Sequence, residues 1–151
     1  MEARLTSIAG QNLSIKLEID TRPPAGGTSS STLITRHFTF VVRHHDLPSL
    51  MSGKLHALLT RPYPKGRDWF DLLWYRSFRP PVSPNLELLQ NALDQTEGVG
   101  RTDASLWKEM VLDRAAGLDF ERLRHDIEPF LERTADLRLL SGECLGTALA
   151  D

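Results

Sequence analysis

The sequence is short of cysteine, of long apolar runs and of positive charge, and each shortage excludes a class of protein. Its 151 residues include one cysteine, Cys144, so no disulfide can form within the chain. No apolar stretch approaches the ~20 residues of a membrane-spanning helix, and residues 1–10 lack the apolar core of a signal peptide. The net charge is -2, so no basic field covers the whole molecule. We therefore expect a cytoplasmic protein.

The first 45 residues predict the β-strand portion of the fold. Apolar residues occupy every second position between residues 12 and 21, which is the pattern of a half-buried strand. Residues 22–31 are rich in Gly, Pro and Ser and predict a loop. Residues 33–43 are rich in β-branched and aromatic side chains and predict a second strand. We expect the two strands to pair as a hairpin with a long loop.

Residues 46–151 predict the helical portion, in the same domain or as a C-terminal subdomain. Asp46 is placed to cap a first helix, which should end near residue 60, before the Pro- and Gly-containing stretch 61–66. Further helices are expected at about 68–78, 85–96, 105–116, 119–130 and 134–150. The fold class is therefore α+β, a short hairpin followed by helices. Two strands alone make a poor sheet, which favours self-association by edge pairing.

Three polar residues of the first predicted strand are candidates for binding a cation and phosphates. Lys16, Glu18 and Asp20 alternate in sequence, so a strand would place them on one face. Carboxylates on such a face can bind a divalent cation. The alternative is a solvated face of an edge strand.

A lysine within the apolar stripe of the first predicted helix is the second candidate. Helical spacing places Lys54 between Leu50 and Leu58. Burial of an unpaired ammonium is costly, so Lys54 should reach an acidic or phosphate partner, unless it extends along the stripe to solvent. His56 points the opposite way and is expected at the surface.

Two acids near the start of the next helix form the third candidate. Asp68 and Asp71 are three residues apart and share a helix face that is otherwise apolar. Lys54 and Arg67 are their expected partners. A purely structural role is the alternative, with Asp68 capping the helix and Asp71 forming an ion pair. Residues 26–28 (Gly-Gly-Thr) are interpreted as a loop, because no Asp-x-Asp pair follows them.

Taken together, three motifs resemble the AbiEii-type nucleotidyltransferase toxin family. They are the Lys-x-Glu strand at 16–18, the Lys-Leu-x-Ala-Leu helix at 54–58 and the Arg-Asp-x-x-Asp-Leu helix at 67–72, in this order. The resemblance is good over residues 13–78 and weaker around 119–131. It implies part of a polymerase-β-like nucleotidyltransferase fold. It also implies nucleotide transfer from a nucleoside triphosphate to an acceptor such as transfer RNA, Mg²⁺ as cofactor, and a role as the toxin of a toxin–antitoxin or phage-defence system.

The resemblance also assigns roles to individual residues. These are Lys54 and Asp68 for catalysis, Lys16, Arg67 and Asp71 for nucleotide binding, and Glu18 and Asp20 for the metal. The family's first motif, a Gly-Gly-Thr/Ser turn with an Asp-x-Asp pair, is not found before residue 13. We therefore expect an N-terminally truncated member. A non-catalytic remnant, or an antitoxin-like binding partner, is the alternative to an incomplete enzyme.

Overall fold

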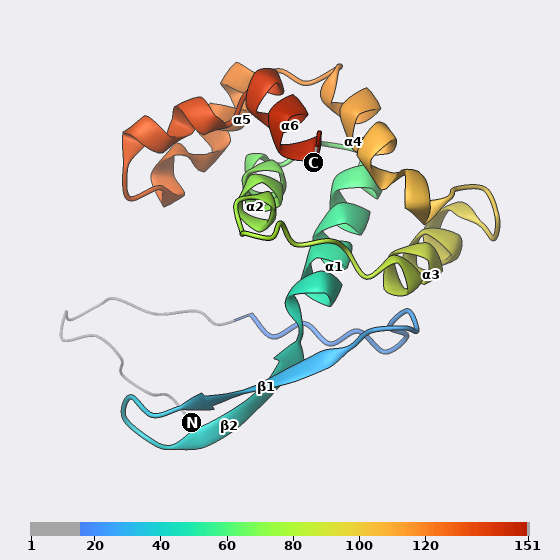
Figure 1. Ribbon diagram of the computed structural model, residues 1–151, viewed down its shortest axis with the longest axis vertical. Helices are drawn as coiled ribbons and strands as arrows, with labels where there is room; N and C mark the ends of the chain where they lie inside the picture. Colours follow the sequence, from blue (N-terminus) through green and yellow to red (C-terminus); the bar gives the residue numbers. More distant parts are fainter. Residues whose placement is uncertain (1–15, 151) are drawn as a thin grey trace.

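The computed structural model, which describes residues 16–150, places a two-stranded hairpin at one end of a helical body (Figure 1). Strand β1 (Ser29–Ile34) pairs with β2 (Phe40–His45) in an antiparallel sheet. Helix α1 (Leu47–Thr60) starts directly after β2 and runs into the body, where the later helices surround it. The predicted α+β class is confirmed.

The hairpin was predicted, but its strands were assigned to the wrong residues. Residues 16–20 form no strand, and residues 12–15 lie outside the described part of the chain. The predicted strand at 33–43 instead contains the end of β1, a turn and most of β2, with Leu33 opposite Val41. The turn has no Gly or Pro to mark it, and the Ser-rich half of β1 has no apolar alternation. Cross-strand pairing therefore determines this strand, and local pattern does not reveal it.

The helical prediction was largely confirmed. After α1 come α2 (Gly66–Arg76), α3 (Leu86–Glu97), α4 (Trp107–Ala115), α5 (Phe120–Ile127) and α6 (Gly142–Leu149). Within residues 16–150, three 3-10 helices lie between them: η1 (Ala104–Leu106), η2 (Glu128–Phe130) and η3 (Thr134–Leu139). The single helix expected at 134–150 is wrong. The helical structure is interrupted after η3. A new helix, α6, starts at Gly142, and the Ser141 side chain caps it by accepting a hydrogen bond from the Cys144 amide.

Helix α1 is the central element of the body because it packs against α2, α3 and α4. Its start is fixed by Asp46, whose carboxylate accepts a hydrogen bond from the Ser49 amide at 3.0 Å. Met51, Leu55 and Leu58 are buried along one face. Leu50, which was expected on the same face, is 40% exposed. The buried face begins at Ser49 and Met51, and Leu50 lies beside it.

A polar junction joins the hairpin to α1 and α3. Gly26 has a φ of 90°, which favours glycine, and its carbonyl accepts a hydrogen bond from the Asn85 side chain at 2.8 Å. The Thr28 hydroxyl donates to the Asp46 carboxylate at 2.6 Å. Residues 26–28 therefore form a loop, as predicted, and this loop fixes the base of the hairpin to the body.

Asn85→Ala is expected to lower the free energy of unfolding by about 2 kcal/mol. Asn85 caps α3 by accepting from the Leu88 amide at 3.1 Å, and a lost cap costs about 1 kcal/mol. The lost hydrogen bond to Gly26 adds about 1 kcal/mol. Urea denaturation would measure the change, with the exposed Gln95→Ala of the same helix as control. Equal midpoints for the two variants would contradict the role of this junction.

Candidate functional site

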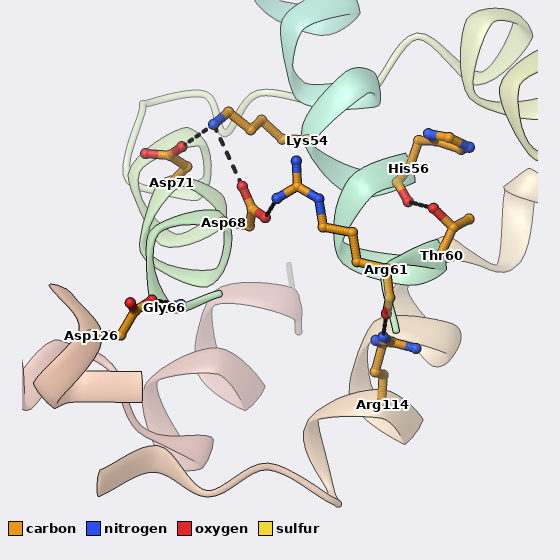
Figure 2. A network of polar contacts seen from close by, with 9 residues as sticks. All are labelled: Lys54, His56, Thr60, Arg61, Gly66, Asp68, Asp71, Arg114 and Asp126. Carbon is orange, nitrogen blue, oxygen red and sulfur yellow. Dashed lines mark hydrogen bonds and ion pairs between the residues drawn. The ribbon is translucent and has the colours of Figure 1, made fainter. Parts of the chain in front are cut away.

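Lys54 of α1 and two acids of α2 form the centre of the candidate site (Figure 2). The Lys54 Nζ lies 2.6 Å from the Asp71 Oδ2 and 3.7 Å from the Asp68 Oδ1. Partial burial by itself would lower the pKa of Lys54. The hydrogen bond to Asp71 and the charges of both acids outweigh this effect, so the pKa is raised above its usual value. Lys54 is therefore a fixed ammonium ion at neutral pH.

Asp68 is buried between two cations. Its Oδ1 faces Lys54, and its Oδ2 accepts a hydrogen bond from the Nη1 of Arg61. Asp68 lies in the first turn of α2, where the helix dipole also stabilises an anion. Both oxygens are thus engaged, and the carboxylate holds the two cationic side chains in place.

Arg61 is a central residue of the site that was not predicted from the sequence. It was assigned only to the break after the first helix, but it caps α1 and its side chain turns back to Asp68 (Figure 2). Its carbonyl accepts a hydrogen bond from Arg114 of α4. A signal was present, because Arg61 follows Lys54 by seven residues, or two helical turns, and so shares its face.

Two cavities open on either side of this cluster. The first, of about 500 Å³, is lined by four cations, by the two acids of α2 and by apolar side chains of α5 and η2. Its cations are Lys54, Arg61, Lys65 and Arg67. The second, of about 600 Å³, lies between α1, α3 and residues 20–24. Lys54, Arg61 and Asp68 line both cavities. The first cavity therefore carries a surplus of positive charge next to a roomier cleft.

The structure brings together some of the predicted site residues and separates others. Lys54, Asp68 and Asp71 meet, as expected. Asp20 lines the second cavity together with Lys54 and Asp68, although it is not on a strand.

Two other expectations about the site need correction. Lys16 and Glu18 form an exposed ion pair with each other, outside any strand, so the common face expected for Lys16, Glu18 and Asp20 does not exist. Arg67 lines the first cavity but does not pair with the acids. Its guanidinium lies 4.9 Å from the centre of the Phe130 ring, and Arg61 takes the expected place beside Asp68. Arg67 is drawn to this ring because Phe130 of η2, a distant part of the chain, packs beside it and offers a cation–π contact.

The acidic residues can be tested for a fit to Mg²⁺. Within residues 16–150, no three His, Cys, Asp or Glu side chains gather in a group that could hold a metal ion. Mg²⁺ is, however, usually held by one or two carboxylates together with substrate phosphates. Asp20, which lines the second cavity, meets that smaller requirement. The residues thus fit a Mg²⁺ that is bound mainly by a phosphorylated ligand.

His56 lies between α1 and α3 and is half-buried, so its expected surface position is wrong. Its Nε2 lies 2.7 Å from the Thr96 Oγ1. Burial lowers the pKa of His56 below its usual value, so the unfolded chain takes up a proton at a higher pH than the folded protein. The stability that His56 contributes is therefore present above the unfolded pKa and is lost as pH falls through it.

We expect the free energy of unfolding to decrease between about pH 7 and pH 5, and to decrease less in His56→Gln. Denaturant titrations at several pH values would measure both slopes. His125→Gln, at an exposed position, is the matched control for the loss of an imidazole. A His56→Gln profile parallel to that of the wild type would contradict the assignment.

Comparison with models of known protein families shows to which family the chain belongs. A family model described as nucleotidyl transferase AbiEii toxin, type IV toxin–antitoxin system, matches residues 1–140. The chain belongs to this family. In this AbiEii family member the match extends beyond the motifs at 16–72 and includes η3, which confirms the resemblance found in the sequence. Searches of curated proteins and of solved structures gave no match. No helix in the described part of the chain is long and apolar enough to cross a membrane.

Proposed function

We propose that this AbiEii family member binds the triphosphate of a nucleoside triphosphate in the first cavity. The observation that carries the proposal is the arrangement of Lys54, Arg61 and Asp68, where one buried acid holds two cations at the edge of two cavities. Lys65 and Arg67 add charge to the first cavity. Phosphate oxygens are the ligands that such fixed cations favour. The second cavity offers room for the nucleoside.

The reaction that fits this arrangement is nucleotidyl transfer to an RNA hydroxyl, with transfer RNA as a candidate acceptor. The hydroxyl oxygen would attack the α-phosphorus, the bond to pyrophosphate would break, and the hydroxyl proton would pass to solvent. Lys54 and Arg61 would stabilise the charge that develops on the phosphates. Asp68, engaged on both oxygens, would then act as a positioning residue for these cations.

Mg²⁺ enters this proposal as the partner of the triphosphate. When bound, it would neutralise phosphate charge and assist the departure of pyrophosphate. Asp20 lines the second cavity, which shares Lys54, Arg61 and Asp68 with the first, and it would contact the metal where the two cavities meet. Glu18 is paired with Lys16, and Asp71 is paired with Lys54. Each acid would have to break its ion pair before it could bind a metal. Lys16 would similarly have to leave Glu18 before reaching a nucleotide.

The biological role that we propose follows the description of the family. The chain would act in the cytoplasm as the toxin of a toxin–antitoxin system, with an antitoxin as its counterpart and phage defence as the setting. Family membership supports this role, and the cation cluster supports the chemistry.

The experiment is a transfer assay with the purified chain. It contains Mg²⁺, each of the four nucleoside triphosphates labelled at the α-phosphate, and total RNA. Label in RNA that depends on Mg²⁺ and is lost in Lys54→Met is the expected result. A folded chain that binds nucleoside triphosphates but transfers no label would refute transfer by this chain alone. A folded chain that binds none would favour a non-catalytic or antitoxin-like partner.

A further inference from the structure

The segment that contains the hairpin is basic, in contrast to the chain as a whole. No Asp or Glu occurs between Asp20 and Asp46, whereas the net charge of the protein is -2. The positive and titratable residues of this segment are Arg22, Arg36, Arg43, His37, His44 and His45. The hairpin therefore presents a local positive surface on an otherwise slightly acidic molecule.

Aromatic and hydroxyl side chains accompany these basic residues. Phe38, in the turn, is 80% exposed, and Phe40, at the start of β2, is 50% exposed. Ser and Thr occupy residues 28–32, 35 and 39. Side chains on both faces of the two strands are exposed, with Ile34 half-buried. Such a surface combines rings for stacking, cations for phosphates and hydroxyls for hydrogen bonds.

The base of this surface reaches the candidate site. His45, the last residue of β2, lines the same cavity as Lys54 and Asp68. The polar junction around Thr28 and Asp46 fixes the hairpin there. Figure 1 shows the hairpin extending away from this point, beyond the start of α1. A chain molecule lying along the hairpin would thus have one end beside the site.

We propose that the β1–β2 hairpin is a docking surface for single-stranded RNA. Exposed aromatic rings stack on unpaired bases, which a duplex keeps inside its own stack. Arg36 and Arg43 would contact phosphates, and the Ser and Thr hydroxyls would contact phosphate oxygens or ribose 2′-hydroxyls. The basic charge disfavours the expected edge pairing of two hairpins, because two copies would bring like charges together. The role of this RNA as acceptor rests on the proposed function, but its binding does not.

The test measures binding without any nucleoside triphosphate, so that it is independent of transfer. Fluorescence anisotropy would follow a labelled single-stranded RNA oligonucleotide at several salt concentrations. Arg36→Ala/Arg43→Ala should weaken binding about tenfold or more and reduce the slope of log K against log salt by about 1.4, or 0.7 per phosphate contact. Arg122→Ala/Arg138→Ala, at exposed positions of α5 and η3, is the matched control and should keep at least half of the wild-type affinity.

A second pair of variants tests stacking. Phe38→Ala should weaken binding about fivefold or more, and Phe38→Trp should restore it, because an aromatic ring at this position stacks on a base. Phe38 is exposed, so neither change should alter thermal unfolding. Duplex RNA of the same length should bind less tightly than the single strand. Equal binding of duplex and single strand, or of Phe38→Ala and wild type, would overturn the stacking geometry and with it the proposal.

The same variants distinguish RNA from other possible ligands of the hairpin. Binding to phosphatidylserine vesicles but not to RNA would overturn the proposal in favour of a lipid surface. A dimer in sedimentation that Arg36→Ala/Arg43→Ala changes, without RNA binding, would overturn it in favour of a second copy. Stronger binding of single-stranded DNA than of RNA would overturn the choice of RNA. RNA binding that needs the hairpin, together with absent label transfer, would support this proposal and refute only the proposed function.

Discussion

Lys54→Met is expected to weaken the binding of Mg²⁺-nucleoside triphosphate to this AbiEii family member by about 10- to 100-fold. A hydrogen bond to a charged group contributes about 1.5–3 kcal/mol, and 1.4 kcal/mol corresponds to a factor of ten. Lys54 lies between both cavities and its raised pKa keeps it charged, so its loss removes the central positive charge. Isothermal titration calorimetry with each of the four nucleotides would measure the change. The methionine keeps most of the side-chain volume and thus the packing on α2.

The control for this prediction is Lys108→Met, which removes a lysine of α4 that lines neither of the two cavities. It should bind nucleotide with wild-type affinity. Arg61→Met provides a second comparison, because it removes a cation of the same cluster and should weaken binding in the same direction. If Lys54→Met binds as tightly as Lys108→Met, the triphosphate does not occupy this cluster.

Gly66→Ala is expected to lower the free energy of unfolding by about 1–3 kcal/mol. Gly66 is the first residue of α2, and a Cβ atom there would lie 2.4 Å from the Leu123 carbonyl oxygen and 2.6 Å from the Ile127 Cγ2. The first of these atoms belongs to the backbone of α5, so α2 and α5 would have to separate. Overpacking of this kind typically costs about 1–3 kcal/mol. The Gly66 amide also donates to the Asp126 carboxylate at 2.8 Å, and separation of the helices would stretch this bond.

The same chain offers a matched control in Gly53→Ala. Gly53 is inside α1, and a Cβ atom there would meet nothing within 4 Å. Alanine is favoured over glycine within a helix by about 0.8–1 kcal/mol, so this variant should be more stable than wild type. Chemical denaturation would place the two variants on opposite sides of wild type. A Gly66→Ala protein as stable as wild type would mean that α2 and α5 are not in the described contact.

The sequence was informative where structure depends on neighbouring residues. Asp46 caps α1 as predicted, and Lys54 pairs with the two acids of α2, as expected from the need of partly buried charges for partners. Helix patterns and caps span a few residues, so they can be read from a short window.

The sequence was misleading where structure depends on distant contacts. The strand assigned to residues 12–21 is not formed at residues 16–20, where Leu17 and Ile19 are exposed despite their alternation. The first half of β1 was interpreted as a loop, because pairing with β2 rather than local pattern determines its position. In the site, the Arg67 guanidinium contacts the Phe130 ring instead of the acids, and Arg61 forms the ion pair with Asp68. No local pattern contains the information that η2 approaches α2 at that point.

Arg61 makes the geometry of the site depend on a residue far outside its motifs. Its side chain holds Asp68 of α2, and its carbonyl is bound by Arg114 of α4, 53 residues further along the chain. The stretch from Lys54 to Asp71 therefore does not contain all the contacts that fix the geometry of the site. Grafted onto another pair of helices, it would carry the same charges without the third helix that anchors the end of α1. A fragment that stops before α4 would keep every residue of the motifs and lose the anchor that aligns them.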